Sequence, residues 1–249
     1  MKNKVAIVTG SGSGIGRATA QLFGKKQYHV IVSDINETGM VETIEMITQN
    51  GGSAEGKICD VSNKTQVHSL FTSTLAEQGS IDAVVNNAGI GGDLKFTHEY
   101  DDDLYDKIVA INQTGVWYCM KQALWIMKAQ DSGGKIVNVS SLAGIGAAPM
   151  MSAYAASKHA VIGMTKTAAS EYGKYNIRVN AVCPTIIDTP MGNSFADSHS
   201  HMIEQMKFGI PMKRFGQPEE VAEVICWLCD NSSSYVNGQE VRVDGGMKA

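Results

Sequence analysis

Three polar residues between Ser141 and Lys158 have the types and spacing needed to transfer a proton. Ser141 precedes Tyr154 by thirteen residues, and Lys158 follows that tyrosine by four. Small and apolar residues continue at helical spacing beyond Gly163, which predicts that Tyr154 and Lys158 share one face of a helix. An ammonium beside a phenol favours the phenolate, which otherwise forms only near pH ~10.

Ser141 can donate a hydrogen bond to a carbonyl or alkoxide oxygen, so the three residues suit the interconversion of an alcohol and a ketone. On its own, however, a Tyr-x-x-x-Lys pair is more often part of an ordinary amphipathic helix face. Other features of the sequence are needed to distinguish the two interpretations.

The elements that would position these residues alternate along the chain. Short runs of β-branched residues predict strands at 5–9, 29–34, 54–60, 81–87, 135–140, 177–183 and 240–244. Amphipathic stretches predict helices near 15–26, 37–50, 63–78, 101–130, 152–173 and 218–230. Nearly continuous apolar strands that alternate with helices indicate a mainly parallel sheet covered on both faces. We therefore expect an α/β fold, a single doubly wound Rossmann-type domain with seven strands over residues 1–249.

A glycine-rich loop joins the first strand to the first helix. Gly10, Gly14 and Gly16 have the spacing G-x-x-x-G-x-G. Glycines here let the backbone approach a pyrophosphate, and the helix that follows offers free N–H groups and the positive end of its dipole. Glycines also serve ordinary turns, but this position in an α/β chain favours nucleotide binding.

Asp34 ends the second predicted strand, eighteen residues after Gly16. A carboxylate there can accept hydrogen bonds from adenosine ribose hydroxyls and would repel a 2′-phosphate. Its immediate neighbours and Ser13 carry no charge, so NAD is predicted in preference to NADP. The alternative is that Asp34 only opens a turn.

Composition and charge exclude other classes of function. The chain has 249 residues, 43% of them hydrophobic, and a net charge of −4 with no basic cluster, which argues against nucleic acid and anionic membranes as partners. The opening apolar run is too short for a signal peptide or a membrane span, so a cytoplasmic protein is expected.

The five cysteines are predicted to be buried thiols. Cys226 and Cys229 have C-x-x-C spacing but lie in a predicted helix without further ligands, which favours core packing over a metal or redox site.

Together these motifs resemble the classical short-chain dehydrogenase/reductase family over the whole chain. The other matching features are Asp60-Val61 after the third strand, Asn86-Asn87-Ala88-Gly89 after the fourth, Asn112-x-x-Gly115, and the ending VNGQEVRVDGG. One departure is Pro184-Thr185, where the family often has Pro-Gly. Because threonine adopts positive φ only at a cost, the loop conformation there is open.

The resemblance implies a role for each site residue. Tyr154 would be the general acid or base, Lys158 would lower the pKa of Tyr154 and bind the nicotinamide ribose, and Ser141 would orient the substrate oxygen. Asn112 would hold a relay water through a backbone kink. The implied cofactor-binding residues are Gly10, Ser13, Gly14, Ile15, Gly16, Asp34, Asp60, Val61, Asn87, Ala88, Gly89, Tyr154, Lys158, Pro184, Ile187 and Thr189.

The substrate pocket is predicted to be mainly apolar, with residues 191–210 as a lid over it. The predicted substrate-binding residues are Ser141, Met150, Met151, Tyr154, Met191 and Phe195. They favour a small hydrophobic or alicyclic secondary alcohol or ketone, with NAD as the oxidant.

Two alternatives remain at this stage. One is a 3-oxoacyl-[acyl-carrier-protein] reductase; such enzymes tend to carry basic residues at the pocket rim and to use NADPH, whereas Ser132 and Tyr175 are uncharged here. The other is a nucleotide-binding sensor without catalysis, which would have no reason to keep the Asn–Ser–Tyr–Lys set. The family also implies a homotetramer, for which the stretches 115–127 and 152–173 are candidate contacts.

Overall fold

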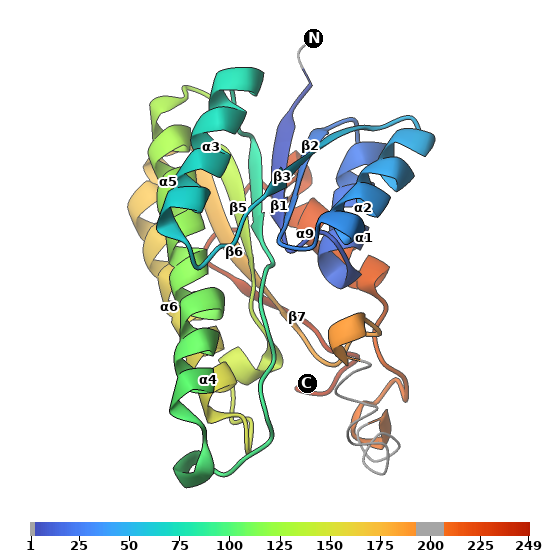
Figure 1. The fold of residues 1–249 in the computed structure, drawn as a ribbon, viewed down its shortest axis with the longest axis vertical. Coiled ribbons are helices and arrows are strands. Elements are labelled where there is room, and N and C mark those ends of the chain that lie inside the picture. The colour runs from blue at the N-terminus through green and yellow to red at the C-terminus, as the bar shows by residue number, and fades with distance from the viewer. Residues whose placement is uncertain (1–2, 193–206) are drawn as a thin grey trace.

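Seven parallel strands form one central sheet in the computed structural model, which describes residues 3–192 and 207–249 (Figure 1). The strands are β1 (Val5–Thr9), β2 (His29–Asp34), β3 (Ser53–Ile58), β4 (Ala83–Asn86), β5 (Gly134–Val139), β6 (Ile177–Pro184) and β7 (Glu240–Val243). Their order in space is β3-β2-β1-β4-β5-β6-β7, and every neighbouring pair is parallel. The order switches direction between β1 and β4, and doubly wound sheets bind ligands beyond the carboxyl ends of the strands at such a point.

Helices cover both faces of the sheet, which confirms the predicted Rossmann-type fold. Figure 1 shows one group beside the first strands and a second group on the opposite face. The first group is α1 (Gly14–Lys25), α2 (Glu37–Gln49) and α9 (Pro218–Leu228); the second is α3 (Lys64–Gln78), α4 (Asp102–Ile108), α5 (Val116–Ala129) and α6 (Ser152–Tyr172).

The single helical stretch predicted over 101–130 is divided in the structure. A π-helical turn, Val109–Gly115, separates α4 from α5. Gly115 lies so close to Val61 that a Cβ added to it would come within 2.8 Å of a valine methyl group. The wider turn places Asn112 in the interior, fully buried. Single π-helical turns of this kind often mark functional sites.

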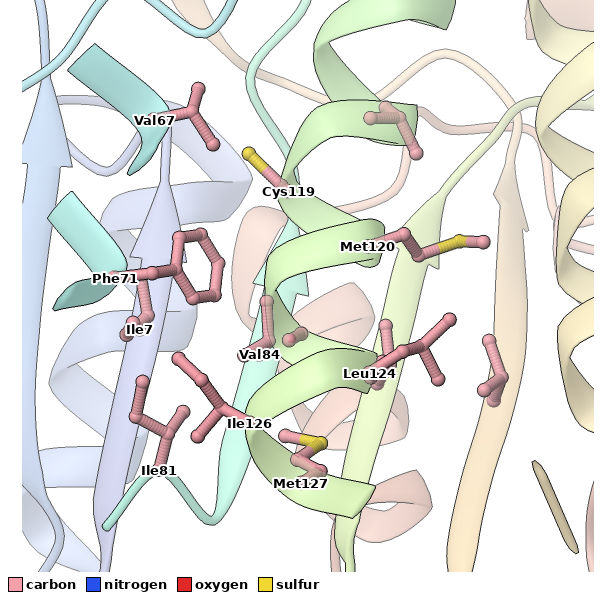
Figure 2. Packing of buried hydrophobic residues seen from close by; sticks show 14 of the residues in the cluster. Ile7, Val67, Phe71, Ile81, Val84, Cys119, Met120, Leu124, Ile126 and Met127 are labelled. Atoms are coloured by element: carbon pink, nitrogen blue, oxygen red, sulfur yellow. The ribbon is translucent and has the colours of Figure 1, made fainter. Parts of the chain in front are cut away.

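A tightly packed apolar layer holds α3 and α5 on the sheet. Figure 2 shows Val67 and Phe71 of α3 near side chains of α5, with Ile7 and Val84 of the sheet beneath them. Phe71 and Met127 are completely buried. Burying one such side chain contributes about 1.5–3 kcal/mol, so this layer makes the sheet a rigid support for the residues at its carboxyl edge.

A chain of buried polar side chains ties the sheet to α6. The Asn86 amide donates to Asn138 Oδ1 at 2.7 Å, and the Asn138 amide donates to Thr165 Oγ1 at 2.8 Å. Asn86 lies on β4, Asn138 on β5 and Thr165 on α6. Buried polar groups are costly unless they are paired, so this chain favours one register of α6 against the strands.

The five cysteines are buried with free thiols, as predicted. Cys226 and Cys229 lie within the apolar cluster under α9. Among the described residues, no group of three or more histidine, cysteine, aspartate or glutamate side chains could hold a metal ion. None of the described helices is long and apolar enough to cross a membrane.

Candidate active site

The glycine loop closes tightly against the start of α1. Gly10 has φ +64°, and Gly14 has φ +53°, conformations that glycine adopts without strain. A Cβ on Gly16 would collide with the Gly10 carbonyl, so only glycine permits this close approach. The Ser13 side chain does not cap the helix, and the first turn of Gly14–Lys25 contains no acidic residue. The first N–H groups of α1 are therefore available to an anion, which fits a dinucleotide pyrophosphate.

The carboxylate of Asp34 is fixed beside this loop. Its Oδ2 accepts a hydrogen bond from Gly12 N at 2.7 Å, and its Oδ1 accepts one from Asn36 N at 2.9 Å. Each oxygen keeps a further lone pair, so the carboxylate can still accept hydrogen bonds from a ligand's hydroxyl groups. Asp34 therefore stabilises the glycine loop and remains able to bind the ribose hydroxyls of a dinucleotide, as predicted.

Arg17 of α1 is the basic side chain that reaches this loop, where it donates to the Gly12 carbonyl. The same guanidinium pairs with Glu42 of α2 at 2.7 Å and donates to Thr43 Oγ1 at 3.1 Å. A guanidinium held by these partners is poorly placed to bind an additional phosphate.

The stretch after β4 is bonded directly to the glycine loop. The Asn87 amide donates to the carbonyls of Thr9 and Gly10 at 3.0 and 2.9 Å, and Ala88 N donates to Thr9 Oγ1 at 3.2 Å. These bonds cross the switch point between β1 and β4. They bring two segments together that are far apart in the sequence and that were both predicted to contact the cofactor.

Asp60 and Val61 follow β3 in a loop that hydrogen bonds hold in place. Asp60 Oδ1 accepts hydrogen bonds from Ser62 N and Ser62 Oγ at 2.9 and 2.7 Å. Val61 is buried beneath the π-helical turn. The same valine thus supports the turn that carries Asn112 and borders the predicted adenine site.

Tyr154 and Lys158 lie one turn apart on α6, as predicted. Lys158 is 4% exposed, and its Nζ donates to the Val139 carbonyl at the end of β5 at 2.9 Å. The ammonium nitrogen lies 5.6 Å from the centre of the Tyr154 ring. Ser141 lies just beyond β5 and interacts with the tyrosine hydroxyl closely enough to affect the pKa of that phenol. The three residues therefore form one cluster at the carboxyl edge of the sheet.

Burial dominates the titration of this cluster. It raises the pKa of Tyr154, and the interaction with Ser141 acts in the opposite direction. It lowers the pKa of Lys158 to about 8, an effect that Cys183 opposes. We expected the ammonium to lower the pKa of the phenol. In the protein alone the pKa of the phenol is raised instead, because both groups are desolvated and the ammonium donates its hydrogen bond to the Val139 carbonyl.

Asn112 joins this cluster from the π-helical turn. Its Oδ1 accepts from Ile90 N at 2.8 Å, and its Nδ2 donates to Ile90 O at 2.9 Å and to Ser157 Oγ at 3.4 Å. A Cβ on Gly89 would lie 3.1 Å from Asn112 Oδ1 and 3.6 Å from Lys158 Nζ. The structure thus brings Asn112, Gly89 and Lys158 together.

The loop after β6 accommodates threonine without strain. Among the described residues, the non-glycine positions with positive φ are Gln27, Met150, Asn176 and Lys213, and Thr185 is not one of them. Thr185 N donates to Val243 O at 3.2 Å, which continues the pairing of β6 with β7. The departure from Pro-Gly therefore leaves the backbone in an ordinary conformation.

Two further predicted cofactor contacts follow in this loop. Ile187 is 5% exposed and pairs with Gly216 in an isolated bridge. Thr189 lies against the glycine loop, since a Cβ on Gly14 would come within 3.1 Å of its methyl group. The segment after β6 therefore reaches the start of α1.

The predicted substrate contacts are spread over two segments. Met150 has φ +66° and is 38% exposed, and Met151 is the N-cap of α6. Met191 is 49% exposed, whereas Phe195 and most of the proposed lid lie outside the described residues. A methionine in the left-handed region is strained, and such strain is concentrated at functional sites.

Three groups that shape the site were not identified from the sequence. They are the Val139 carbonyl that holds Lys158, the backbone of Ile90 that holds Asn112, and Lys95, whose N–H donates to Met150 O at 3.0 Å. All three act through backbone atoms. Every residue type carries those atoms, so no sequence signal marks them.

Comparison with known proteins gives matches over the full length of the chain. A protein-family profile described as "Enoyl-(Acyl carrier protein) reductase" matches residues 10–248. The 3-oxoacyl-[acyl-carrier-protein] reductase of Thermotoga maritima is 38% identical over 99% of this chain and 98% of its own length. The 2,5-dichloro-2,5-cyclohexadiene-1,4-diol dehydrogenase of Sphingobium indicum is 37% identical over 100% and 98%. The structure of an NAD⁺-bound xylitol dehydrogenase superposes with a TM-score of 0.94 at 31% identity, covering 98% of this chain and 99% of that one.

The lowered pKa of Lys158 predicts a specific dependence of stability on pH. Its folded pKa of about 8 lies below its ordinary value of 10.5, so between these values the unfolded chain binds more protons and this group adds stability as the pH rises. Below about pH 8 the Lys158 side chain is charged in the folded protein, so the full cost of burying that charge lowers the free energy of unfolding. Lys158→Met removes that penalty, so the variant's free energy of unfolding relative to the wild type should be highest near neutral pH. That difference should fall by roughly 2 kcal/mol by about pH 9.5.

Urea unfolding of both proteins at about pH 7 and about pH 9.5 measures this difference. Lys166→Met, an exposed position on the same helix, is the matched control. A difference between Lys158→Met and the wild type that stays constant across this range would contradict the prediction.

Proposed function

Because the chain belongs to the classical short-chain dehydrogenase/reductase family, we propose that it is an NAD-dependent dehydrogenase for a small hydrophobic or alicyclic secondary alcohol and its ketone. The observation that carries the proposal is the cluster at the carboxyl edge of the sheet. There the ammonium nitrogen of the buried Lys158 lies 5.6 Å from the centre of the Tyr154 ring, and Ser141 acts on the Tyr154 hydroxyl. This geometry suits proton exchange with a substrate oxygen.

In the proposed reaction the bound nicotinamide supplies reversible hydride transfer. Burial keeps the Tyr154 phenol protonated near neutral pH, so the hydroxyl is ready to donate its proton to a ketone oxygen. Ser141 orients that oxygen and stabilises the charge that develops on it. Lys158 supplies a positive charge that favours the phenolate left behind, and the same steps in reverse describe alcohol oxidation. Asn112 keeps the π-helical turn in place beside Lys158.

The residues proposed to hold the cofactor come from several segments at or after the carboxyl ends of the strands. They run from the glycine loop (Gly10, Ser13, Gly14, Ile15, Gly16) through Asp34, Asp60 and Val61 to Asn87, Ala88 and Gly89, and then from Tyr154 and Lys158 to Pro184, Ile187 and Thr189. The preference for NAD is supported by the Asp34 carboxylate at the loop and by the pairing of Arg17 with Glu42. We propose that residues 1–249 act as one NAD-binding domain.

The choice of substrate is supported by the apolar side chains near the site. Met150, Met151 and Met191 are partly exposed and flank the cluster in sequence. One of the relatives is named for a cyclohexadiene diol, a ring-shaped secondary alcohol. These observations support a small, apolar secondary alcohol as the substrate.

A 3-oxoacyl-[acyl-carrier-protein] reductase is the second candidate. One relative carries that name, and the family description refers to acyl carrier protein. The ammonium groups of Lys128 and Lys174 lie 5.1 and 5.2 Å from the centre of the Tyr175 ring. They supply basic charge beside a rim position that is itself uncharged, which weakens our sequence argument against an acidic carrier. Rates with cyclic alcohols and NAD, compared with rates for acetoacetyl thioesters and NADPH, separate the two candidates; dominant thioester turnover would favour the reductase.

A cytoplasmic homotetramer is part of the proposal. Its support is the set of large apolar side chains that α5 exposes, with Trp117 at 43% and Trp125 at 69%, together with the five free thiols. Exposed aromatic side chains on one helix suit contact with another copy of the chain.

Replacing Tyr154 with phenylalanine removes the proposed proton donor and keeps the ring. We expect kcat to fall by about 10²–10⁴ in both directions of the reaction, because general acid–base catalysis contributes about this factor. The measurement is NADH absorbance during a screen of secondary alcohols and ketones. Binding of NADH, followed by fluorescence, should weaken far less than kcat falls, because most of the proposed cofactor contacts come from other residues. A variant that retains more than about a tenth of the wild-type kcat would contradict the assigned role.

Replacing Asp34 with asparagine should shift the cofactor preference toward NADP. The variant keeps an amide oxygen for the Gly12 N–H but loses the charge that would repel a 2′-phosphate. We expect the ratio of kcat/KM for NAD to that for NADP to fall by roughly ten- to a hundredfold, the size of one or two charged hydrogen bonds. Asp103→Asn removes the same charge from an exposed position on α4 and serves as the control. An unchanged ratio in Asp34→Asn would refute the assignment.

A further inference from the structure

A cavity of about 430 Å³ lies at the amino end of the sheet, whereas the candidate active site lies at the carboxyl edge. Its walls come from the residues before β1, from the turn between α1 and β2, and from the end of α9. The lining residues that matter here are Lys4, Phe23, Lys26, Tyr28, Cys226 and Asp230. Its size falls within the range of sites for small molecules, and it combines an apolar wall with a few polar groups.

The Tyr28 hydroxyl is an unpaired donor in this cavity. The residue is 9% exposed, and its hydroxyl has no hydrogen-bond partner anywhere in residues 3–192 or 207–249. Its ring is fixed by an edge contact with Phe23 at 4.9 Å and by Lys4 Nζ at 5.7 Å. Burial raises the pKa of Tyr28, so the hydroxyl keeps its proton. The hydroxyl oxygen itself is reached by solvent, so it can donate a hydrogen bond to a ligand in the cavity.

Positive charge around the cavity is only partly balanced. Lys4 and Lys26 line it, and within the described part of the chain neither forms an ion pair. Lys135 and Arg178 occupy paired positions on β5 and β6 nearby. Burial, and then repulsion from Lys4 and Arg178, lowers the pKa of Lys135. Arg178 bonds to backbone carbonyls, those of Val236 and Asp230, at 3.1 and 3.0 Å.

Three carboxylates lie among these four cations, and one of them is Glu223 of α9, which acts on Cys226 together with Lys26. Asp82 accepts a hydrogen bond from Val5 N at 2.8 Å, and Asp230 accepts one from Ser232 N at 2.8 Å. Four positive charges against three negative ones leave an excess of positive charge. That excess attracts an anion, and a phosphate monoester is negatively charged near neutral pH.

We propose that this cavity binds a small organic phosphate. The ammonium groups of Lys4 and Lys26 and the hydroxyl of Tyr28 hold the phosphate oxygens, and the wall formed by Phe23 and Cys226 receives the apolar part of the ligand. The site is independent of the proposed dehydrogenase activity, because none of its residues belongs to the cluster around Tyr154.

Calorimetric titration of the full chain with inorganic phosphate and with glycerol 3-phosphate tests the proposal. Ionic strength is held constant with chloride, because attraction between lysine and an anion is screened by salt. We expect saturable binding of both probes, with the ester tighter. Lys26→Gln and Tyr28→Phe should each raise the dissociation constant at least about fivefold, the effect of losing one hydrogen bond to a charged group. The control Lys25→Gln removes a neighbouring exposed lysine and should leave binding unchanged.

The first turn of α1 is a competing phosphate site, so the titrations are repeated with saturating NAD. Binding that NAD abolishes and that Lys26→Gln and Tyr28→Phe leave unchanged would place the anion at the glycine loop and overturn the proposal. Absence of saturable binding, or equal weakening by Lys25→Gln, would overturn it as well. Melting temperatures without phosphate establish that Tyr28→Phe is folded, and Lys26→Gln changes only an exposed side chain.

Discussion

The placement of the Lys158 ammonium inside the protein is the constraint on which the rest of the site depends. Water is excluded from it, and the Val139 carbonyl is its hydrogen-bond partner at 2.9 Å. A buried charge must be paired or hydrogen-bonded, so the end of β5 and the first turns of α6 have to keep a fixed distance. Tyr154 lies on α6 and Ser141 just beyond β5, so both are aligned by the same requirement.

Several features of the fold maintain that distance. The buried chain from Asn86 through Asn138 to Thr165 links the sheet to α6, and the apolar layer under α5 keeps the neighbouring strands rigid. The π-helical turn brings Asn112 to the same place from the other side. The cluster around Tyr154 is thus supported by contacts between elements far apart in the sequence. The proposed cofactor site also depends on such contacts, since Asn87 is bonded to the glycine loop across the switch point.

Much of this architecture could be predicted from the sequence, because periodicity and glycine spacing are local signals. The strands at 5–9 and 29–34 have the predicted bounds, and the predicted helix at 152–173 is α6, Ser152–Tyr172. The third strand ends at Ile58, so Asp60 lies in a loop. The π-helical turn inside 101–130 could not be predicted, because it depends on the contact of Gly115 with Val61. The raised pKa of Tyr154 could not be predicted either, because it depends on burial, which is a property of the folded chain.

The central claim is that the charge on Lys158 supports proton transfer by Tyr154, and the pH dependence of kcat/KM for ketone reduction tests it most directly. Burial lowers the pKa of Lys158 to about 8, so kcat/KM should be constant below this pH and fall above it. Lys158→Arg keeps a positive charge to much higher pH, because a guanidinium stays protonated in proteins. The pH at which kcat/KM begins to fall should therefore be higher by more than about one pH unit in this variant. An active Lys158→Arg variant whose falling limb coincides with that of the wild type would contradict it.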